Sequence, residues 1–296
     1  MAADAGRADP ATDALALSEA IAAVLRARKA GRAVAPERLA VPVPGGVLLC
    51  MPAADDAVAI VKNITVHPAN RDRPVIQGEV LVVEAATGRK LAVLDARELT
   101  ARRTAAVSLL AARLLAPRRQ GPLCVFGAGV QARGHVEAFC QGLGVREVRL
   151  VSRSRARAEA LAEVAARQGV VVRVLDDAAA AVRDAALIVT ATTSPEPVFP
   201  DTVAEDVFVA AVGSFTPEAA EVPASLVGRA TLFVDDMASA RVEAGDFLRA
   251  GVDWDAVTAL EDILDAPPRP TGPVLFKTVG HALFDLAAAR LACAGL

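Results

Sequence analysis

The sequence predicts an α/β fold in which a doubly wound parallel sheet follows a smaller α+β domain. Three observations support this: strand and helix patterns alternate after residue 121, a glycine-rich turn opens that region, and hairpin-like strand patterns precede it. A chain of 296 residues is long enough to bury two cores. We therefore expect one domain over 1–118, a second over 119–277, and a final helical segment, 278–296, that returns to the first domain.

The expected first domain begins with a helix and continues with strands. Leu17, Ile21 and Leu25 recur on one face of a helix that we expect over 13–29, with Gly31 as its end. Residues 1–12 are few, polar and alanine-rich, and we expect them to be disordered. The expected strands are 47–49, 58–66, 79–84 and 90–94, followed by a helix over 100–115 and a linker over 116–121.

A Gly-x-Gly-x-x-Ala turn lies between an expected strand, 122–126, and an expected helix, 131–141. Gly127 permits a tight turn, Gly129 lets the backbone approach a pyrophosphate, and Ala132 lets the helix lie close to the strand. The free N–H groups at a helix N-terminus favour phosphate. We interpret this turn as a dinucleotide site, the alternative being a plain strand–helix corner.

Strands and helices continue to alternate after this turn, as they do in a parallel sheet. A proline-rich stretch at 266–270 separates this region from the final helix, which we expect over 278–293. The expected strands are 147–152, 170–174, 186–191, 207–212 and 231–235, and the clearest helix is 155–167.

Composition excludes several classes of function. The formal net charge of −3 leaves no electrostatic footprint for nucleic acid. Apolar residues make up 54% of the chain, but no uncharged apolar run reaches the length of a membrane span, and charges interrupt any signal-peptide core. Four scattered cysteines and three distant histidines form neither a disulfide framework nor a metal motif. We expect a soluble, cytoplasmic protein that binds no metal, membrane or nucleic acid.

The loop after the second strand of the parallel sheet bears on the choice of nicotinamide cofactor. NAD-preferring folds carry an acid there for the ribose 2′-hydroxyl, whereas this loop reads Ser152-Arg153-Ser154-Arg155. An acid would repel a 2′-phosphate, and guanidinium groups can bind it with paired hydrogen bonds. We therefore predict NADPH, with NADH as a weaker alternative. The other interpretation is a solvated, arginine-rich start to the next helix.

Lys62 lies on the apolar face of an expected strand. In the stretch 58–66 the even-numbered residues share one face, which places Lys62 between Ile60 and Ile64. An ammonium among apolar side chains is costly unless an anion meets it, and a substrate carboxylate would be such an anion. An edge-strand lysine that reaches water explains the pattern equally well.

Arg38 and Arg103 are two more cations whose positions a ligand anion could explain. Arg38 precedes the first strands, and Arg103 falls in the first turn of the helix expected over 100–115, where a cation opposes the helix dipole. An anionic ligand would explain either cation, and an exposed arginine is the plainer interpretation.

These features together resemble the ornithine cyclodeaminase/mu-crystallin family. The likeness runs from about residue 36 to the C-terminus, and its specific pieces are Arg-Thr-Ala-Ala-Val-Ser at 103–108 and Gly-Ala-Gly-Val-Gln-Ala at 127–132. The stretch 65–79 is similar to bacterial reductases that convert Δ1-pyrroline-2-carboxylate to L-proline and Δ1-piperideine-2-carboxylate to L-pipecolate. The other matching segments are 41–53, 61–62, 211–213, 243–246 and 276–280.

The resemblance implies a substrate-binding and dimerisation domain joined to a Rossmann domain, in a homodimer whose first-domain strands pair across subunits. The resemblance implies that Arg38 and Lys62 bind the substrate carboxylate, that Lys62 is the catalytic residue, and that Glu243 lies in the substrate pocket. Cofactor contacts are implied for Arg103, Thr104, Gly127, Gly129, Val130, Gln131, Ser152, Arg153, Ser154, Thr192 and Thr278.

One departure from the family narrows the expected reaction. Cyclodeaminases carry an aspartate shortly after the glycine of Ala211-Val212-Gly213, and this chain has Phe215 at that place. A phenyl ring cannot accept a proton, so we expect NADPH-dependent reduction of a small cyclic imino acid. The alternatives are an NAD-dependent ornithine cyclodeaminase, a non-catalytic NADPH-dependent ligand binder, and an enzyme that reduces linear imines formed from a 2-oxo acid and ammonia or methylamine.

Overall fold

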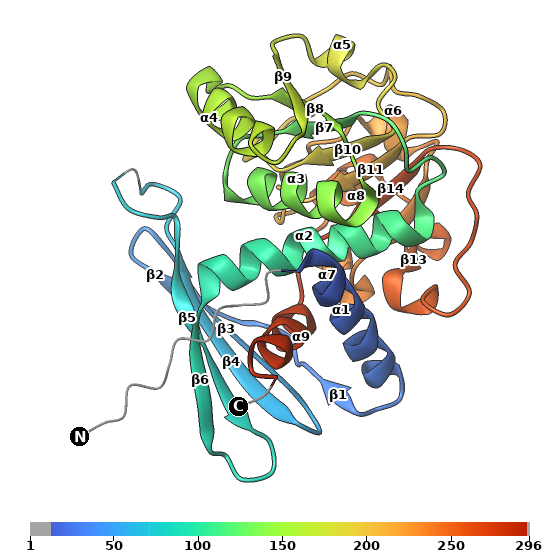
Figure 1. Ribbon diagram of the computed structural model, residues 1–296. Helices are drawn as coiled ribbons and strands as arrows, with labels where there is room; N and C mark the ends of the chain where they lie inside the picture. Colours follow the sequence, from blue (N-terminus) through green and yellow to red (C-terminus); the bar gives the residue numbers. More distant parts are fainter. Residues whose placement is uncertain (1–12, 71, 295–296) are drawn as a thin grey trace. The chain divides into compact units, whose positions relative to one another are not determined.

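The computed structural model describes residues 13–70 and 72–294, so the segment expected to be disordered, 1–12, lies outside the described residues. The chain forms two compact units (Figure 1). Unit 1 contains the residues up to Arg103 and those from His281 onward, and unit 2 contains Thr104–Gly280. The division falls inside the long helix α2 (Ala96–Leu115). The domain limits expected at 118 and 277 stay predictions.

Unit 1 is an antiparallel sheet with two helices on one face (Figure 1). The strand order is β1-β3-β4-β5-β6, and β2 pairs with β3. Helix α9 packs on β3 and β4, and α1 packs on α9. The elements are α1 (Ala14–Lys29), β1 (Ala33–Val34), β2 (Leu39–Val43), β3 (Gly46–Asp55), β4 (Val58–Val66), β5 (Ile76–Glu84), β6 (Lys90–Asp95) and α9 (Ala282–Ala292).

Local sequence explains these elements. Asp13 caps α1, because its side chain accepts a hydrogen bond of 2.9 Å from the backbone N–H of Leu15. Along β4 the even-numbered residues are buried and the odd-numbered ones are more exposed, which is the alternation expected of a sheet covered on one face. Because α9 covers β4, the buried face of the strand is the face toward the helices.

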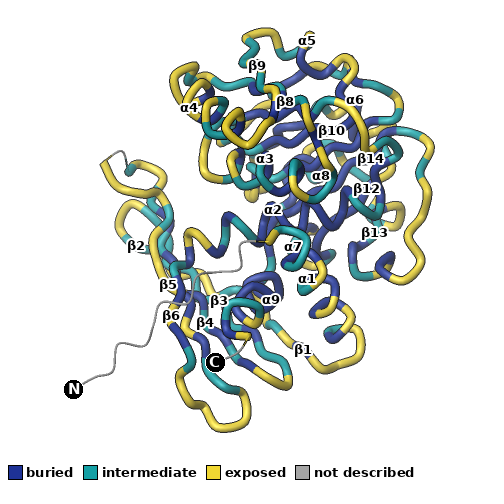
Figure 2. Tube along the Cα trace, in the orientation of Figure 1, coloured by how far each residue is buried: buried dark blue, intermediate teal, exposed yellow. Residues whose placement is uncertain are grey.

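Unit 2 is an eight-stranded parallel sheet in the order β13-β12-β14-β11-β10-β7-β8-β9, and this confirms the predicted doubly wound fold. Its central strands are buried, as Figure 2 shows. The strands are β7 (Leu123–Phe126), β8 (Glu147–Val151), β9 (Val171–Leu175), β10 (Leu187–Thr190), β11 (Phe208–Ala211), β12 (Thr231–Val234), β13 (Thr258–Ala259) and β14 (Val274–Lys277). The helices are α3 (Val130–Leu143), α4 (Arg155–Ala166), α5 (Ala178–Val182), α6 (Ala224–Val227), α7 (Met237–Glu243) and α8 (Gly245–Ala250).

The order of strands in unit 2 reverses at β7. From β7 the chain continues to β8 and β9 on one side, and then crosses to β10 and β11 on the other. In open sheets of this kind ligands bind outside the carboxyl ends of the strands at such a reversal. The loops after β7, β8, β10, β11 and β14 therefore form the edge of unit 2 to which a ligand would bind.

Two expected helices begin elsewhere. Helix α2 starts at Ala96, so Arg103 lies well inside it and the argument from its first turn was wrong. Helix α9 starts at Ala282, and Thr278 therefore lies in the loop between β14 and that helix. Strands β1, β2, β13 and β14 were not predicted.

Candidate active site

Lys62 is buried on the helix-covered face of the sheet in unit 1. It lies on β4 between Ile60 and Ile64, as its position in the alternating pattern predicted. Its neighbours in register are Met51 on β3 and Val80 on β5, and both are buried. Because β4 pairs on both sides, the interpretation of Lys62 as an edge-strand lysine is wrong. Only 1% of its side chain is exposed, so the ammonium needs an anion within the protein or from a ligand.

Asp285 of α9 supplies an anion to two buried cations of unit 1. Its Oδ2 lies 2.6 Å from Nζ of Lys62, and its Oδ1 accepts a hydrogen bond of 3.1 Å from Nε of Arg103. The Asp285 side chain is fully buried, and the Arg103 side chain is 7% exposed. One carboxylate therefore holds both cations with one oxygen each.

The surroundings shift the pKa of both Lys62 and Asp285. Burial lowers the pKa of Lys62 from its usual value to about 8; Asp285 opposes this change, and the positive charges of Arg103 and Arg38 add to it. Burial acts to raise the pKa of Asp285, but Lys62 and Arg103 outweigh that effect and hold the pKa below its usual range. The structure thus brings Arg38, Lys62 and Arg103 into one electrostatic environment.

The charges of this cluster do not cancel. Among the described residues, the two buried cations Lys62 and Arg103 share the single carboxylate of Asp285. A buried excess of positive charge is unfavourable unless an anion joins it. A small carboxylate is one anion that would balance this charge.

Asp285 was not predicted from the sequence, although the sequence contains a signal for it. Helix α9 is apolar around most of its circumference and buried, and Asp285 is an acid in its first turn. A fully buried helix that keeps an aspartate must give it a partner. The apolar surroundings of Lys62 indicate only that an anion is needed, and they do not distinguish a ligand from an acidic side chain of a distant segment.

In unit 2 the glycine turn has the geometry of a phosphate site. Gly127 has a φ of +112°, and a Cβ there would lie 2.5 Å from the carbonyl oxygen of Ala191. Gly129 is the N-cap of α3 without a side-chain cap, and a Cβ there would meet open space. The buried Oε1 of Gln131 has no hydrogen-bond partner among the described residues. These features fit a dinucleotide whose pyrophosphate approaches Gly129 and Val130 at the start of α3.

The two arginines after β8 have different surroundings. Arg155 is held by Glu159 at 2.9 Å and by Asp176 at 3.0 Å, so acidic side chains already neutralise it. Arg153 is exposed, and within residues 13–70 and 72–294 its guanidinium makes a long contact of 3.5 Å with the Thr193 hydroxyl and no ion pair. Its guanidinium is therefore the one available to an anion. Ser152 and Ser154 shape this loop, since Oγ of Ser152 accepts a hydrogen bond from the backbone N–H of Ser154.

Glu221 joins two of the loops at the carboxyl edge of the sheet. Its Oε1 accepts hydrogen bonds of 2.7 Å from the backbone N–H and the hydroxyl of Thr192, after β10. Its Oε2 accepts from the backbone N–H groups of Gly213 and Ser214, after β11, and from the Thr190 hydroxyl. Burial raises the pKa of Glu221 above its usual value. This carboxylate therefore sets the place of Thr192, a predicted cofactor contact.

A second buried pair extends this network to β14. Oδ1 of Asp246 accepts from the backbone N–H groups of Glu221 and Val222, and Oδ2 lies 2.9 Å from Nζ of Lys277. Lys277 also donates to the carbonyl oxygen of Ser214. Three buried charged side chains, Glu221, Asp246 and Lys277, thus connect the ends of three adjacent strands, β10, β11 and β14.

Thr278 is held by Asp235, which follows β12. The Thr278 hydroxyl donates a hydrogen bond of 2.6 Å to Oδ2 of Asp235, and the backbone N–H groups of Val279 and Gly280 donate to the same carboxylate. The loop that carries Thr278 therefore has a defined conformation.

A buried histidine supports the first turn of α3. Nδ1 of His135 lies 2.7 Å from the carbonyl oxygen of Gln131, and Nε2 lies 3.0 Å from Oγ of Ser108 on α2. A carbonyl can only accept, so Nδ1 carries the hydrogen and the Ser108 hydroxyl donates to Nε2. Burial lowers the pKa of His135 to about 4, and the ring is neutral near pH 7.

The remaining predicted residues lie elsewhere. Thr104 is buried in α2 and Glu243 is half-buried at the end of α7, both in unit 2, and the place of Glu243 in the substrate pocket stays a prediction. Phe215 is 47% exposed on the loop after β11. Over residues 13–70 and 72–294, no three His, Cys, Asp or Glu side chains gather as a metal site requires.

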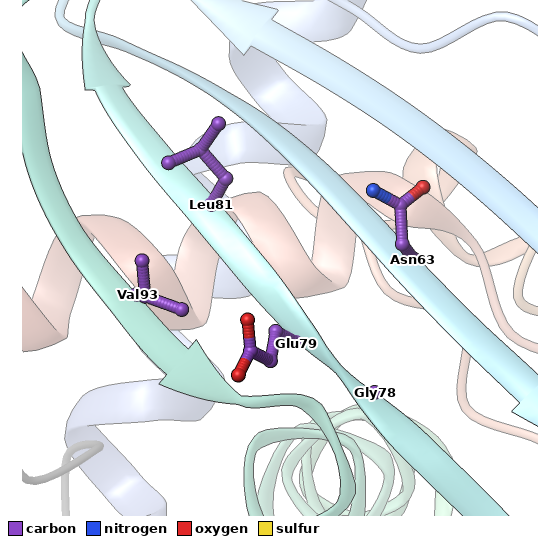
Figure 3. Close-up of a pocket in the computed structure, with 5 residues that line it drawn as sticks. All are labelled: Asn63, Gly78, Glu79, Leu81 and Val93. Atoms are coloured by element: carbon purple, nitrogen blue, oxygen red, sulfur yellow. The ribbon is translucent and has the colours of Figure 1, made fainter.

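A shallow groove of about 550 Å³ lies on the opposite face of the unit 1 sheet. Figure 3 shows the five residues that line it, on β4, β5 and β6. Asn63 belongs to the odd-numbered face of β4, so the groove and Lys62 are on different sides of the strand. Leu81 and Val93 expose 38% and 37% of their surface there. This groove is thus separate from the buried cluster.

Comparisons with known proteins give relatives along most of the chain. The profile of the ornithine cyclodeaminase/mu-crystallin family matches residues 7–293. A Δ1-pyrroline-2-carboxylate reductase 1 of Burkholderia multivorans is 43% identical over 269 residues, covering 89% of this chain and 85% of the relative. A Δ1-pyrroline-2-carboxylate/Δ1-piperideine-2-carboxylate reductase of Azospirillum brasilense is 41% identical, with the same coverage.

A solved structure is similar throughout the fold. The Δ1-pyrroline-2-carboxylate reductase of Thermococcus litoralis, solved with NADH and L-proline, superposes with a TM-score of 0.88 at 26% identity. The match covers 94% of this chain and 91% of the other. In the part of the chain that the structure describes, no helix is long and apolar enough to cross a membrane.

Proposed function

Because the chain belongs to the ornithine cyclodeaminase/mu-crystallin family, we propose that it reduces small cyclic imino acids. The proposed reactions convert Δ1-pyrroline-2-carboxylate to L-proline and Δ1-piperideine-2-carboxylate to L-pipecolate. The class is that of an oxidoreductase acting on a C=N bond, in line with bacterial relatives that are named as reductases of Δ1-pyrroline-2-carboxylate and Δ1-piperideine-2-carboxylate. The observation that carries the proposal is the buried cluster in which Lys62 and Arg103 share the carboxylate of Asp285.

This cluster supports recognition of the carboxylate of an imino acid. Lys62 and Arg38 are the proposed partners of that carboxylate, which would complete the charge balance of the cluster. Holding the carboxylate on a strand of a rigid sheet fixes the direction of the adjacent ring carbon, C2. Met51 and Val80, the buried neighbours of Lys62 in register, keep water away from the pair.

The cofactor, when bound, supplies the hydride that C2 receives. We propose NADPH, held by the backbone at Gly127, Gly129 and Val130, with NADH as a weaker substitute. Support for the 2′-phosphate comes from Arg153, whose guanidinium has no acidic partner within salt-bridge distance in the described structure. Further proposed contacts to the cofactor are Arg103, Thr104, Gln131, Ser152, Ser154, Thr192 and Thr278.

Reduction of an imine also adds a proton to the ring nitrogen. Lys62 has a pKa of about 8, so Nζ keeps its proton in neutral solution. The ammonium can therefore pair with the substrate carboxylate and hold a proton close to the ring. Water and Lys62 are the two proposed sources of the proton.

The loop after β11 favours reduction over deamination. Phe215 occupies the place at which cyclodeaminases carry an aspartate, and its exposed phenyl ring offers no group that accepts a proton. We therefore propose that ornithine is not deaminated.

The test is oxidation of NADPH by the purified protein with each cyclic imine, followed by near-ultraviolet absorbance of the reduced nicotinamide. We expect consumption of NADPH with formation of L-proline or L-pipecolate, and slower consumption of NADH. Binding of NADPH without its oxidation would support a ligand-binding protein instead. Ammonia and proline formed from ornithine with catalytic NAD would support a cyclodeaminase. Faster turnover of a 2-oxo acid with ammonia or methylamine than of the cyclic imines would indicate that linear imines are the substrates.

The outer face of the unit 1 sheet is the proposed homodimer surface. Leu39, Val41, Leu81 and Val93 expose apolar side chains over its strands, and Leu81 and Val93 line the groove of Figure 3. We expect light scattering to give the mass of a dimer, and Leu81→Glu to give a monomer.

The four free thiols fit a reducing compartment, for which we propose the cytoplasm.

A further inference from the structure

Asp285 is the anion of the buried cluster, and the proposed reaction does not use it directly. Its two oxygens are divided between two cations from different elements, Lys62 on β4 and Arg103 on α2. All three side chains are at least nine-tenths buried. An aspartate in that position is costly to bury, and its position indicates a role in the arrangement of its partners.

We propose that Asp285 is a positioning residue for the imino acid site, holding Lys62 and Arg103 in place and keeping the Lys62 ammonium charged for the substrate carboxylate. This inference rests on the proposed function. It adds a role for a residue of α9, a helix distant in sequence from every other group proposed to bind the substrate.

The surroundings of Lys62 show why such an anion is needed. On the face of the sheet that carries Lys62, its neighbours on its own strand and on both adjacent strands are apolar, so they do not stabilise an ammonium. The charged groups that act on it are Asp285 of α9, Arg103 of α2 and Arg38, which precedes β2. Both arginines disfavour the charged form, and Asp285 alone favours it. Without Asp285, burial and two cations would together drive the proton from Nζ.

Helix α9 provides a matched comparison within the same unit. Arg290, near its other end, donates to Oδ2 of Asp55 at 2.7 Å, so a second ion pair also joins this helix to the sheet. That pair does not act on Lys62. Arg290→Gln therefore removes a contact between helix and sheet without altering the cluster.

The experiment measures the binding of pyrrole-2-carboxylate, a planar carboxylate of the same ring size, across pH. Its carboxylate stays ionised over the range used, so loss of affinity at high pH reports loss of the Lys62 charge. In the wild type we expect affinity to fall as pH rises through about 8, the pKa of Lys62. In Asp285→Asn the midpoint should move down by about one to three pH units, the usual effect of losing a close opposite charge.

Three other variants test the interpretation. Arg103→Gln removes a cation that disfavours the Lys62 charge, so its midpoint should move up, and the midpoint of Arg290→Gln should not move. Asp285→Glu keeps the charge but misplaces it; we expect an unchanged midpoint and roughly tenfold weaker binding. An unmoved midpoint in Asp285→Asn, or wild-type affinity in Asp285→Glu, overturns the proposal. The readout needs no turnover, so a protein that reduces no imine would refute the proposed function and leave this test intact.

Discussion

Thr278 donates a hydrogen bond of 2.6 Å from its hydroxyl to Oδ2 of Asp235, and this contact links the ends of two adjacent strands in unit 2. The backbone N–H groups of Val279 and Gly280 donate to the same carboxylate. Hydrogen bonds to a charged acceptor are stronger than those to a neutral one, so the aspartate fixes this loop more firmly than an amide would. A proposed cofactor contact thus depends on a residue that itself need not touch the cofactor.

The first prediction concerns this carboxylate. Asp235→Asn should lower the free energy of unfolding by about 2–4 kcal/mol, because several buried hydrogen bonds lose their charged acceptor. It should also weaken NADPH binding, since the loop is less firmly held. Urea denaturation and a fluorescence titration with NADPH measure the two effects. Thr278→Ser keeps the hydroxyl and serves as the control; wild-type stability in Asp235→Asn would contradict the argument.

Lys62→Met is the second prediction. The change removes the ammonium and keeps an apolar side chain of similar length, while Asp285 retains Arg103 as its partner. We expect kcat/KM for the cyclic imine to fall by about a hundredfold or more, and NADPH binding to survive. Steady-state kinetics and cofactor titration separate the two. Lys90→Met, at the exposed start of β6, is the control, and near-wild-type turnover in Lys62→Met would refute the role of Lys62.

The position of Lys62 could be predicted because strand periodicity is local. Alternation along 58–66 is enough to place its side chain on the apolar face, and the structure confirms that face. Periodicity says nothing about which distant segment covers the face. The partner is Asp285, more than two hundred residues later in the chain, and only the packing of α9 on β4 brings it there.

Unit 2 shows the same limit. The glycine turn and the alternating elements predict the parallel sheet. Strand β14 was not predicted, although it lies inside the sheet between β11 and β12. Its four residues follow a proline-rich stretch and are too few for a period to be seen. Likewise, Arg153 and Arg155 are only two residues apart in the sequence, and only the structure shows that acidic partners neutralise Arg155.

The third prediction uses that difference between the two arginines. Arg153→Ala should raise the KM for NADPH by about tenfold and leave the KM for NADH unchanged, because only NADPH carries the 2′-phosphate. Arg155→Ala should change neither KM by much, since Glu159 and Asp176 already hold its guanidinium. Steady-state kinetics with both cofactors measure this. Equal losses for NADH and NADPH in Arg153→Ala would show that the residue does not contact the phosphate.

The fourth prediction is a pH dependence of stability that originates at His135. The folded protein keeps this ring neutral down to a pH of about 4, whereas an unfolded histidine gains its proton near the usual value of 6.5. Between these values the unfolded chain binds more protons, so stability rises with pH across the window. The contribution of His135 is complete above pH 6.5 and is lost as the pH falls toward 4. Its size is about 3 kcal/mol, from the linkage of pKa to free energy.

Replacing the ring tests this assignment. His135→Phe removes the titrating group together with its contacts to Ser108 and the Gln131 carbonyl, so the protein should be less stable at pH 7. Its free energy of unfolding should then depend less on pH between 4 and 6.5 than that of the wild type. Urea denaturation at several pH values measures the slope, and His67→Gln, on a histidine outside this network, should leave it unchanged. If His135→Phe kept the wild-type slope, the pH dependence would come from other groups. His135 would then have the same pKa in the folded and the unfolded protein, which contradicts the prediction.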